Sequence, residues 1–318
     1  MPSSIGLDSV TLVSIFVEAI LYGLFTALFV ASTFILLRKF RRPKHISNKP
    51  LLIASFTMFI LATVHIGTDL RRLMDAFLRS PDPVAALGQV NTPISLLKNT
   101  TYALQTLVGD AFILYRLYLV WNGDKRVVVP ILICFVASIG VGIGALQAFA
   151  KAAPDALVFI VSLEHWIVSF FALTLFTNLC STFLIACRTW WVHRRTRGIM
   201  KSGENVLPAM VLIIESGSIY SACLIILLVL YLSGSFAQYI LLDAVTQVIG
   251  VVFTLVIVRV ALGISTETVK TPSMNKSTTF RVSDMGGRST DNSDAYLESN
   301  INMKPLNVKK TVEIVEYV

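Results

Sequence analysis

Residues Val10–Leu37 of this chain read VTLVSIFVEAILYGLFTALFVASTFILL, and Glu18 is the only charged side chain among them. A helix needs about 20 apolar residues to cross the hydrocarbon core of a bilayer. Because unpaired backbone groups are costly in lipid, a run of this kind that spans a membrane must be helical. The stretch therefore predicts a transmembrane helix.

Six further apolar runs of similar length follow the first. Together they predict seven transmembrane helices, at about residues 10–37, 51–70, 102–120, 127–149, 167–187, 206–232 and 236–262. The chain has 318 residues, of which 55% are hydrophobic and 14% charged, whereas soluble domains carry roughly 25% charged residues. This composition excludes a soluble enzyme and a disordered protein. We expect an all-α, polytopic integral membrane protein with a seven-helix bundle in residues 1–263.

After Gly263 the sequence turns to Ser, Thr, Asn and charged residues, which predicts a disordered tail over residues 264–318. The 27 Lys and Arg residues gather in the loops on one side of the predicted helices and in this tail. The exceptions are Arg71, Arg72, Arg79, Lys98 and Lys151. By the positive-inside rule the N-terminus is outside and the tail is cytoplasmic. We favour the plasma membrane over internal membranes, and we expect no nucleic-acid partner because no basic stripe interleaves with exposed aromatic residues.

Ionisable side chains within the predicted helices are functional candidates, because such groups are costly in lipid. Helical spacing puts His65 and Asp69 on one face of the second helix, and Asp243 on one face of the seventh. These faces and that of Glu18 are expected to meet in an outward-facing polar pocket. The pocket candidates are Glu18, His65, Asp69, Arg72, Gln105, Asp243 and Gln247. The alternative is that Arg71 and Arg72 only neutralise the nearby carboxylates and so join helices.

Two further carboxylates, Asp110 and Glu215, lie deeper in the predicted helices and are candidates for an intramembrane switch that changes protonation. Asp110 could instead only bond Thr106 and a neighbouring helix. The inner-loop arginines are the candidate surface for a cytoplasmic signalling partner; they are Arg116, Arg194, Arg195 and Arg197. Asn99 begins an Asn-Thr-Thr sequon on the outer side and is a glycosylation candidate.

No catalytic motif is recognised, so we expect no enzyme, cofactor or metal: the sequence has no P-loop and no nucleophile elbow. His65 and Asp69 are four residues apart and could begin a zinc site. Such a site needs at least three protein ligands, and the only other histidine at membrane level is His165. A metal-dependent membrane hydrolase is therefore the weakest functional alternative.

The segment Thr106-Leu107-Val108-Gly109-Asp110, with Tyr115-Arg116 and Val120-Trp121 after it, resembles an uncharacterised family of seven-transmembrane proteins of basidiomycete fungi. Glu215-Ser216-Gly217 with Tyr220 is similar to the second hallmark of that family. The resemblance runs over most of residues 8–265. It implies the seven-span fold and no mechanism. Likeness to G-protein-coupled receptors is confined to topology, which is an argument by association.

We therefore expect a receptor-like membrane protein that senses a small or lipidic ligand and signals through its basic cytoplasmic loops. The ligand must bind two states of the bundle with different affinity for this to work. The main alternative is a secondary transporter or proton-linked carrier that uses the intramembrane carboxylates. Against it, no proline interrupts the middle of any predicted span, whereas broken midplane helices are common in transporters.

Overall fold

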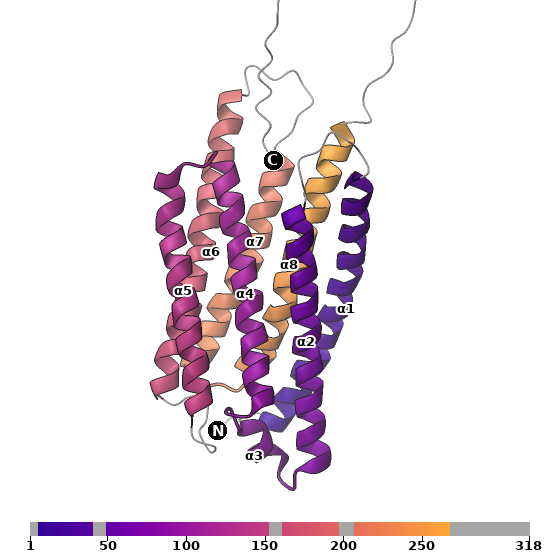
Figure 1. The fold of residues 1–318 in the computed structure, drawn as a ribbon, viewed down its shortest axis with the longest axis vertical. Coiled ribbons are helices and arrows are strands. Elements are labelled where there is room, and N and C mark those ends of the chain that lie inside the picture. Colours follow the sequence, from indigo (N-terminus) through magenta and orange to yellow (C-terminus); the bar gives the residue numbers. More distant parts are fainter. Residues whose placement is uncertain (1–5, 41–48, 153–160, 197–206, 268–318) are drawn as a thin grey trace, which may run out of the picture.

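The computed structural model describes residues 6–40, 49–152, 161–196 and 207–267. Its helices are α1 (Leu7–Phe40), α2 (Lys49–Arg79), α3 (Pro83–Gly88), α4 (Pro93–Val120), α5 (Lys125–Lys151), α6 (Val161–Thr196), α7 (Leu207–Leu232) and α8 (Gln238–Glu267). Over these residues every regular element is helical, which confirms the all-α class. The long helices run up and down along one axis and form a single elongated bundle (Figure 1).

The bundle has two ends, which we name after residues. The Leu7 end is where α1, α4, α6 and α8 begin, and the Trp121 end is where α2, α5 and α7 begin (Figure 1). Because α1 begins at the Leu7 end and α8 finishes at the Trp121 end, the first and last described helices have their free ends on opposite sides. An odd number of membrane crossings requires this arrangement.

The bundle exposes large apolar side chains on its outside and buries polar side chains within an otherwise apolar core. Phe16 and Phe183 are 66% and 67% exposed, whereas Glu18 and Gln105 are completely buried. A surface of this kind is unfavourable in water and suits lipid. Six helices of the described residues are long and apolar enough to cross a membrane, and Gly217–Leu232 of α7 forms a shorter apolar segment. The protein is a multi-pass membrane protein, while the seventh crossing stays a prediction.

The predicted spans leave residues 71–101 as an outer loop that carries Pro81, Pro83 and Pro93, but most of this segment is helical. Thr92 caps α4, because its Oγ1 accepts a hydrogen bond from the Ser95 amide at 3.2 Å, and Pro93 occupies the first turn. Asp82 caps α3 in the same way, ahead of Pro83. Proline favours the first position of a helix, where its missing N–H costs nothing. As a result α4 begins nine residues before the expected position, 102.

Other helix boundaries also differ from the predicted ones, because the helices extend past the apolar runs into polar sequence. α2 continues to Arg79 rather than ending near residue 70, and α6 covers Val161–Thr196 rather than 167–187. α8 continues to Glu267, four residues into the segment expected to be the tail. The remainder of that segment, 268–318, lies outside the described residues.

α1, α2 and α8 are mutual neighbours, as expected for the first, second and last spans, and α4 lies against α2, α5, α6 and α8. α1 and α8 approach closely at Gly250, where an added Cβ would lie 2.6 Å from the Phe25 ring. Small residues permit such close packing in membranes, where van der Waals contact drives helix association. The close approach brings the polar faces of α1 and α8 together.

Candidate functional site

A cluster of five buried ionisable side chains joins four helices near the Leu7 end. Lys98 of α4 stands between two carboxylates: its Nζ lies 2.6 Å from Asp69 Oδ1 on α2 and 2.7 Å from Asp243 Oδ1 on α8. All three side chains are at most 8% exposed. Charged groups within a bundle are tolerated when they pair with one another. Lys98 therefore links α2, α4 and α8 through ion pairs.

The rest of the cluster centres on His65. Its Nδ1 lies 2.7 Å from Glu18 Oε1 on α1 and 3.9 Å from Asp69 Oδ2, and its Nε2 lies 4.0 Å from Asp243 Oδ1. Gln247 Nε2 donates to the same Glu18 oxygen at 3.0 Å. Ser14 completes the group, because its hydroxyl donates to Asp243 Oδ2 at 2.5 Å.

We call these residues the ion cluster, and its members are Ser14, Glu18, His65, Asp69, Lys98, Asp243 and Gln247. Three carboxylates and one lysine leave a net charge of −2, so neutrality of the cluster requires two protons, held by His65 and the carboxylates. Net charge in a low-dielectric interior is costly. The ion cluster is therefore a place where a proton can be held, close to the Leu7 end.

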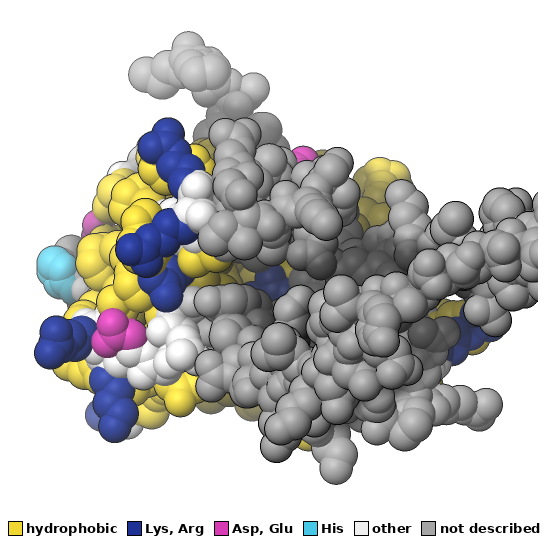
Figure 2. All heavy atoms as spheres, turned by 90° about the horizontal axis from the view of Figure 1, so that it is seen from above, with side chains coloured by type: hydrophobic (Ala, Val, Ile, Leu, Met, Phe, Trp, Pro, Cys, Tyr) yellow, Lys and Arg dark blue, Asp and Glu magenta, His cyan; other side chains and the backbone are white. Residues whose placement is uncertain are grey.

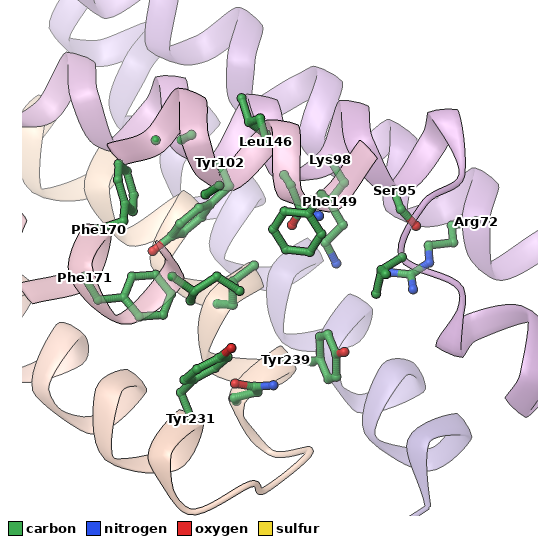
Figure 3. Close-up of a pocket in the computed structure, with 18 residues that line it drawn as sticks. Arg72, Ser95, Lys98, Tyr102, Leu146, Phe149, Phe170, Phe171, Tyr231 and Tyr239 are labelled. Atoms are coloured by element: carbon green, nitrogen blue, oxygen red, sulfur yellow. The ribbon is translucent and has the colours of Figure 1, made fainter. Parts of the chain in front are cut away.

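A pocket opens beside the ion cluster, between α4, α5, α6 and α8 (Figure 3). Its empty volume is about 810 Å³, including the open mouth. Arg72, Ser95 and Lys98 lie on one side in this view, and Phe170 and Phe171 lie on the other. Lys98 thus belongs to the pocket wall and to the ion cluster at once.

Arg72 differs from Lys98 in its partners. Its guanidinium donates to the backbone carbonyl of Leu87, and its Nε is buried without an acceptor in the described part of the chain. Among the residues that the structure describes, Arg72 has no carboxylate within ion-pair distance, whereas its neighbour Arg71 lies 3.8 Å from Asp75. Gln238, which is 3% exposed, also lines the pocket, and its Nε2 has no acceptor within the ranges that the structure describes.

A second polar region lies deeper in the bundle. Asp110 is completely buried, and neither carboxylate oxygen has a hydrogen-bond partner in the described part of the chain. Tyr102 and Thr106 precede it at four-residue intervals on α4, and their hydroxyl groups lie close enough to interact with each other. Tyr220 of α7 is close enough to interact electrostatically with Asp110. Buried polar atoms are normally satisfied, by protein or by water.

The structure brings together most of the residues that the sequence singled out as pocket candidates. Glu18, His65, Asp69, Asp243 and Gln247 form the ion cluster. The remaining two candidates lie next to it: the Gln105 amide donates to the Thr246 carbonyl on α8 at 3.3 Å, and Arg72 lines the pocket.

Sequence reasoning missed Lys98, which was expected in an outer loop. The signal for it was present, because Lys98, Tyr102, Thr106 and Asp110 recur every four residues and so share one helix face. Arg71 and Arg72 were expected to neutralise Asp69, Asp75 or Asp243. Arg71 does lie against Asp75, on the surface, whereas Arg72 contacts the Leu87 carbonyl and neither pairs with Asp69 or Asp243 among the described residues.

The two switch candidates have different environments. Asp110 is buried at the centre of the bundle, whereas the side chain of Glu215 on α7 is exposed. Asn99 lies within α4 and lines the pocket, so the sequon occupies a helix beside the cavity.

The arginines expected to face a cytoplasmic partner lie at the Trp121 end, where Figure 2 shows Lys and Arg side chains beside apolar flanks of the helices. Arg194 packs over the Trp190 ring at 3.9 Å, and Arg195 packs over the Trp191 ring at 4.4 Å. Arg116 is half-buried and packs over Phe112, within the bundle. Arg197 lies outside the described residues.

Glu18, His65 and Asp69 could each offer one ligand atom to a metal ion, and these atoms lie within 4.8 Å of one another. Glu18, on another helix, therefore offers a third ligand atom, whereas His165 is exposed on α6. However, the Lys98 ammonium already contacts Asp69 at 2.6 Å and would repel a divalent cation. The arrangement favours a proton over a metal ion.

Comparisons with protein-family models, curated proteins and solved structures find no match to this chain. The function of the protein is therefore inferred from the geometry of the ion cluster and the pocket.

Proposed function

We propose that this protein is a receptor-like sensor that crosses the membrane seven times and binds a small amphipathic or lipidic molecule in the pocket beside the ion cluster. One observation carries the proposal: Lys98 lines the pocket and also holds Asp69 and Asp243. A molecule in the pocket would act on the residue that joins three helices. Support for membership of the basidiomycete family comes from the sequence resemblance alone.

Binding at Lys98 offers a route to a change of state. A ligand shifts a conformational equilibrium only if it interacts differently with the two states. A ligand group next to Lys98 would weaken or strengthen its hold on α2 and α8, and α4 would carry that difference along the bundle. In the proposed orientation the Trp121 end is cytoplasmic, so Arg194 and Arg195 would face a signalling partner.

Two glycines of α5 provide a matched test of the pocket. An added Cβ at Gly142 would lie 3.2 Å from the Phe170 ring, which lines the pocket, whereas nothing lies within 4 Å of such a Cβ at Gly140. Gly142→Leu should fill the pocket, and Gly140→Leu should only add apolar surface facing lipid. Native mass spectrometry of the purified protein should find a bound molecule in the wild type and Gly140→Leu and not in Gly142→Leu.

The receptor-like part of the proposal needs a readout of conformation. Spin labels attached at Lys125 and Arg194, on the Trp121 end of α5 and α6, would report the spacing of these helices. We expect different distance distributions for the wild type and Gly142→Leu. Identical occupancy and identical distances in all variants would remove the pocket as the sensing site.

A proton-linked carrier is the second candidate, and Asp110 favours it. A completely buried carboxyl group without partners among the described residues, on the same helix as Lys98, is suited to accepting and releasing a proton. In proteoliposomes with an internal pH dye, a carrier should move protons with its solute, and Asp110→Asn should stop the movement. Glu215→Gln is the matched control because that carboxylate is exposed. Proton movement that is unchanged in Asp110→Asn would exclude this mechanism.

A further inference from the structure

The pocket has a polar side and an apolar side. Figure 3 shows Arg72 reaching in from the side of Ser95 and Lys98, while Phe170 and Phe171 lie across the cavity from it. The remaining apolar lining comes from α5 and α6, including Phe149 and Ile167. A ligand that matched both sides would have one polar group at one end of an apolar body.

The polar side offers hydrogen-bond donors that lack acceptors. Arg72 Nε and Gln238 Nε2 are both buried and without partners in the part of the chain that the structure describes. A buried donor without an acceptor costs free energy, which a ligand acceptor would recover. A group with two acceptor oxygens suits Arg72, because arginine binds carboxylates through two parallel hydrogen bonds.

The charge of the ligand's polar group follows from the two cations of the pocket. Lys98 already contacts two carboxylates, at 2.6 and 2.7 Å, so its charge is matched within the protein. Arg72 is the cation of the pocket without a carboxylate partner among the described residues. One unmatched positive charge fits a monoanion, whereas a doubly charged phosphate group would bring more negative charge to a region that already holds three carboxylates.

The size and lining of the cavity restrict the body of the ligand. The empty space of about 810 Å³ includes the open mouth, so the enclosed part of the cavity is smaller than this figure. The aromatic rings of Phe149, Phe170 and Phe171 favour an aromatic ring or a single aliphatic chain. A phospholipid with two full acyl chains exceeds this space.

We propose that the pocket binds an amphipathic monocarboxylic acid, with its carboxylate on Arg72 and Gln238 and its apolar body against Phe170 and Phe171. This inference rests on the proposed function, because it names the ligand class of the same pocket. The acid could be a soluble aromatic acid or a single-chain fatty acid from the bilayer. Both present the same carboxylate to Arg72.

The test uses two acids and their matched alcohols as probes: 4-phenylbutyrate with 4-phenylbutanol, and dodecanoate with dodecanol. Binding to the full-length protein in phosphatidylcholine nanodiscs would be measured by microscale thermophoresis at pH 7. We expect each acid to bind at least tenfold more tightly than its alcohol. Tighter binding of 4-phenylbutyrate would indicate a soluble source, and tighter binding of dodecanoate would indicate the bilayer.

Variants of the adjacent Arg72 and Arg71 distinguish recognition of the carboxylate by Arg72 from a general effect of positive charge on acid binding. Arg72→Gln should weaken binding of the acids at least tenfold and leave binding of the alcohols unchanged. Arg71→Gln removes the same charge one residue away, from a side chain that is 71% exposed, and should have no effect. Gln238→Leu provides a second variant in case Arg72→Gln does not fold, and it should weaken acid binding about fivefold.

Equal binding of acids and alcohols, or acid binding unaffected by both Arg72→Gln and Gln238→Leu, would overturn the carboxylate assignment. The proposed function would survive that result if a molecule still copurified with the wild type and was lost in Gly142→Leu. Conversely, acid binding that persisted in Gly142→Leu would place the carboxylate site elsewhere. The two failures are thus distinguishable.

Discussion

The ammonium of Lys98 on α4 lies 2.7 Å from Oδ1 of Asp243 on α8, and both side chains are buried within the bundle. The same ammonium contacts Asp69 on α2 at 2.6 Å. A single lysine therefore holds three helices together beside the pocket. This relationship makes the ion cluster sensitive to any change at position 98, whether from mutation or from a ligand.

Lys98→Met should strongly destabilise the protein, because it leaves Asp69 and Asp243 buried without their cation. Removal of one partner from a buried ion pair typically costs about 3–5 kcal/mol. Arg79→Met is the control: Arg79 pairs with Asp75 at 2.8 Å but is 76% exposed, so a loss below about 1 kcal/mol is expected. Thermal unfolding in nanodiscs measures the stability lost in each variant. Equal losses of stability in the two variants would contradict a structural role for Lys98.

The His65–Glu18 contact should give a measurable coupling energy in a double-mutant cycle with His65→Gln and Glu18→Gln. The atoms lie 2.7 Å apart between α1 and α2, out of contact with lipid, so we expect about 1–2 kcal/mol. Tyr22 and Thr63 join the same two helices through an exposed contact of 2.9 Å. A cycle with Tyr22→Phe and Thr63→Ala should give about 0.6 kcal/mol or less. Similar energies for both cycles would show that burial does not strengthen the first contact.

Two glycines should respond in opposite ways to alanine. A Cβ at Gly250 would meet the Phe25 ring at 2.6 Å, so Gly250→Ala should separate α1 from α8 and cost about 1–3 kcal/mol. Nothing lies within 4 Å of a Cβ at Gly67 on α2. Gly67→Ala should therefore stabilise the helix by about 0.5–1 kcal/mol. The unfolding temperatures of the two variants would be compared with that of the wild type. A higher unfolding temperature for Gly250→Ala would show that α1 and α8 are not in close contact there.

The proposed orientation makes the Trp121 end cytoplasmic and the Leu7 end external. With the exposed Cys187 first replaced by Ser, single cysteines would be placed at exposed Ala85 on α3 and at exposed Lys125 on α5. A membrane-impermeant maleimide applied to intact cells should label Ala85→Cys, and Lys125→Cys only after permeabilisation. The reverse pattern would invert the orientation, and labelling of both from outside would exclude the alternating arrangement.

The sequence predicted the helical fold well because long apolar runs have one stable backbone arrangement in lipid. It predicted the helix ends poorly. Pro83 and Pro93 suggested a loop, but each lies in the first turn of a helix that the preceding residue caps. A proline in that position and a proline in a loop have the same local sequence signal, and the capping hydrogen bonds distinguish them.

The sequence by itself determined that polar faces of the first, second and last helices exist, because helical periodicity fixes which residues share a face. Glu18, His65, Asp69 and Asp243 could be named on that basis. Only the tertiary structure decided which cation neutralises them: Lys98 contacts Asp69 and Asp243, while Arg72 is turned toward the pocket. The reason is that periodicity acts within one helix, whereas ion pairing depends on the rotation and depth of neighbouring helices, which packing sets.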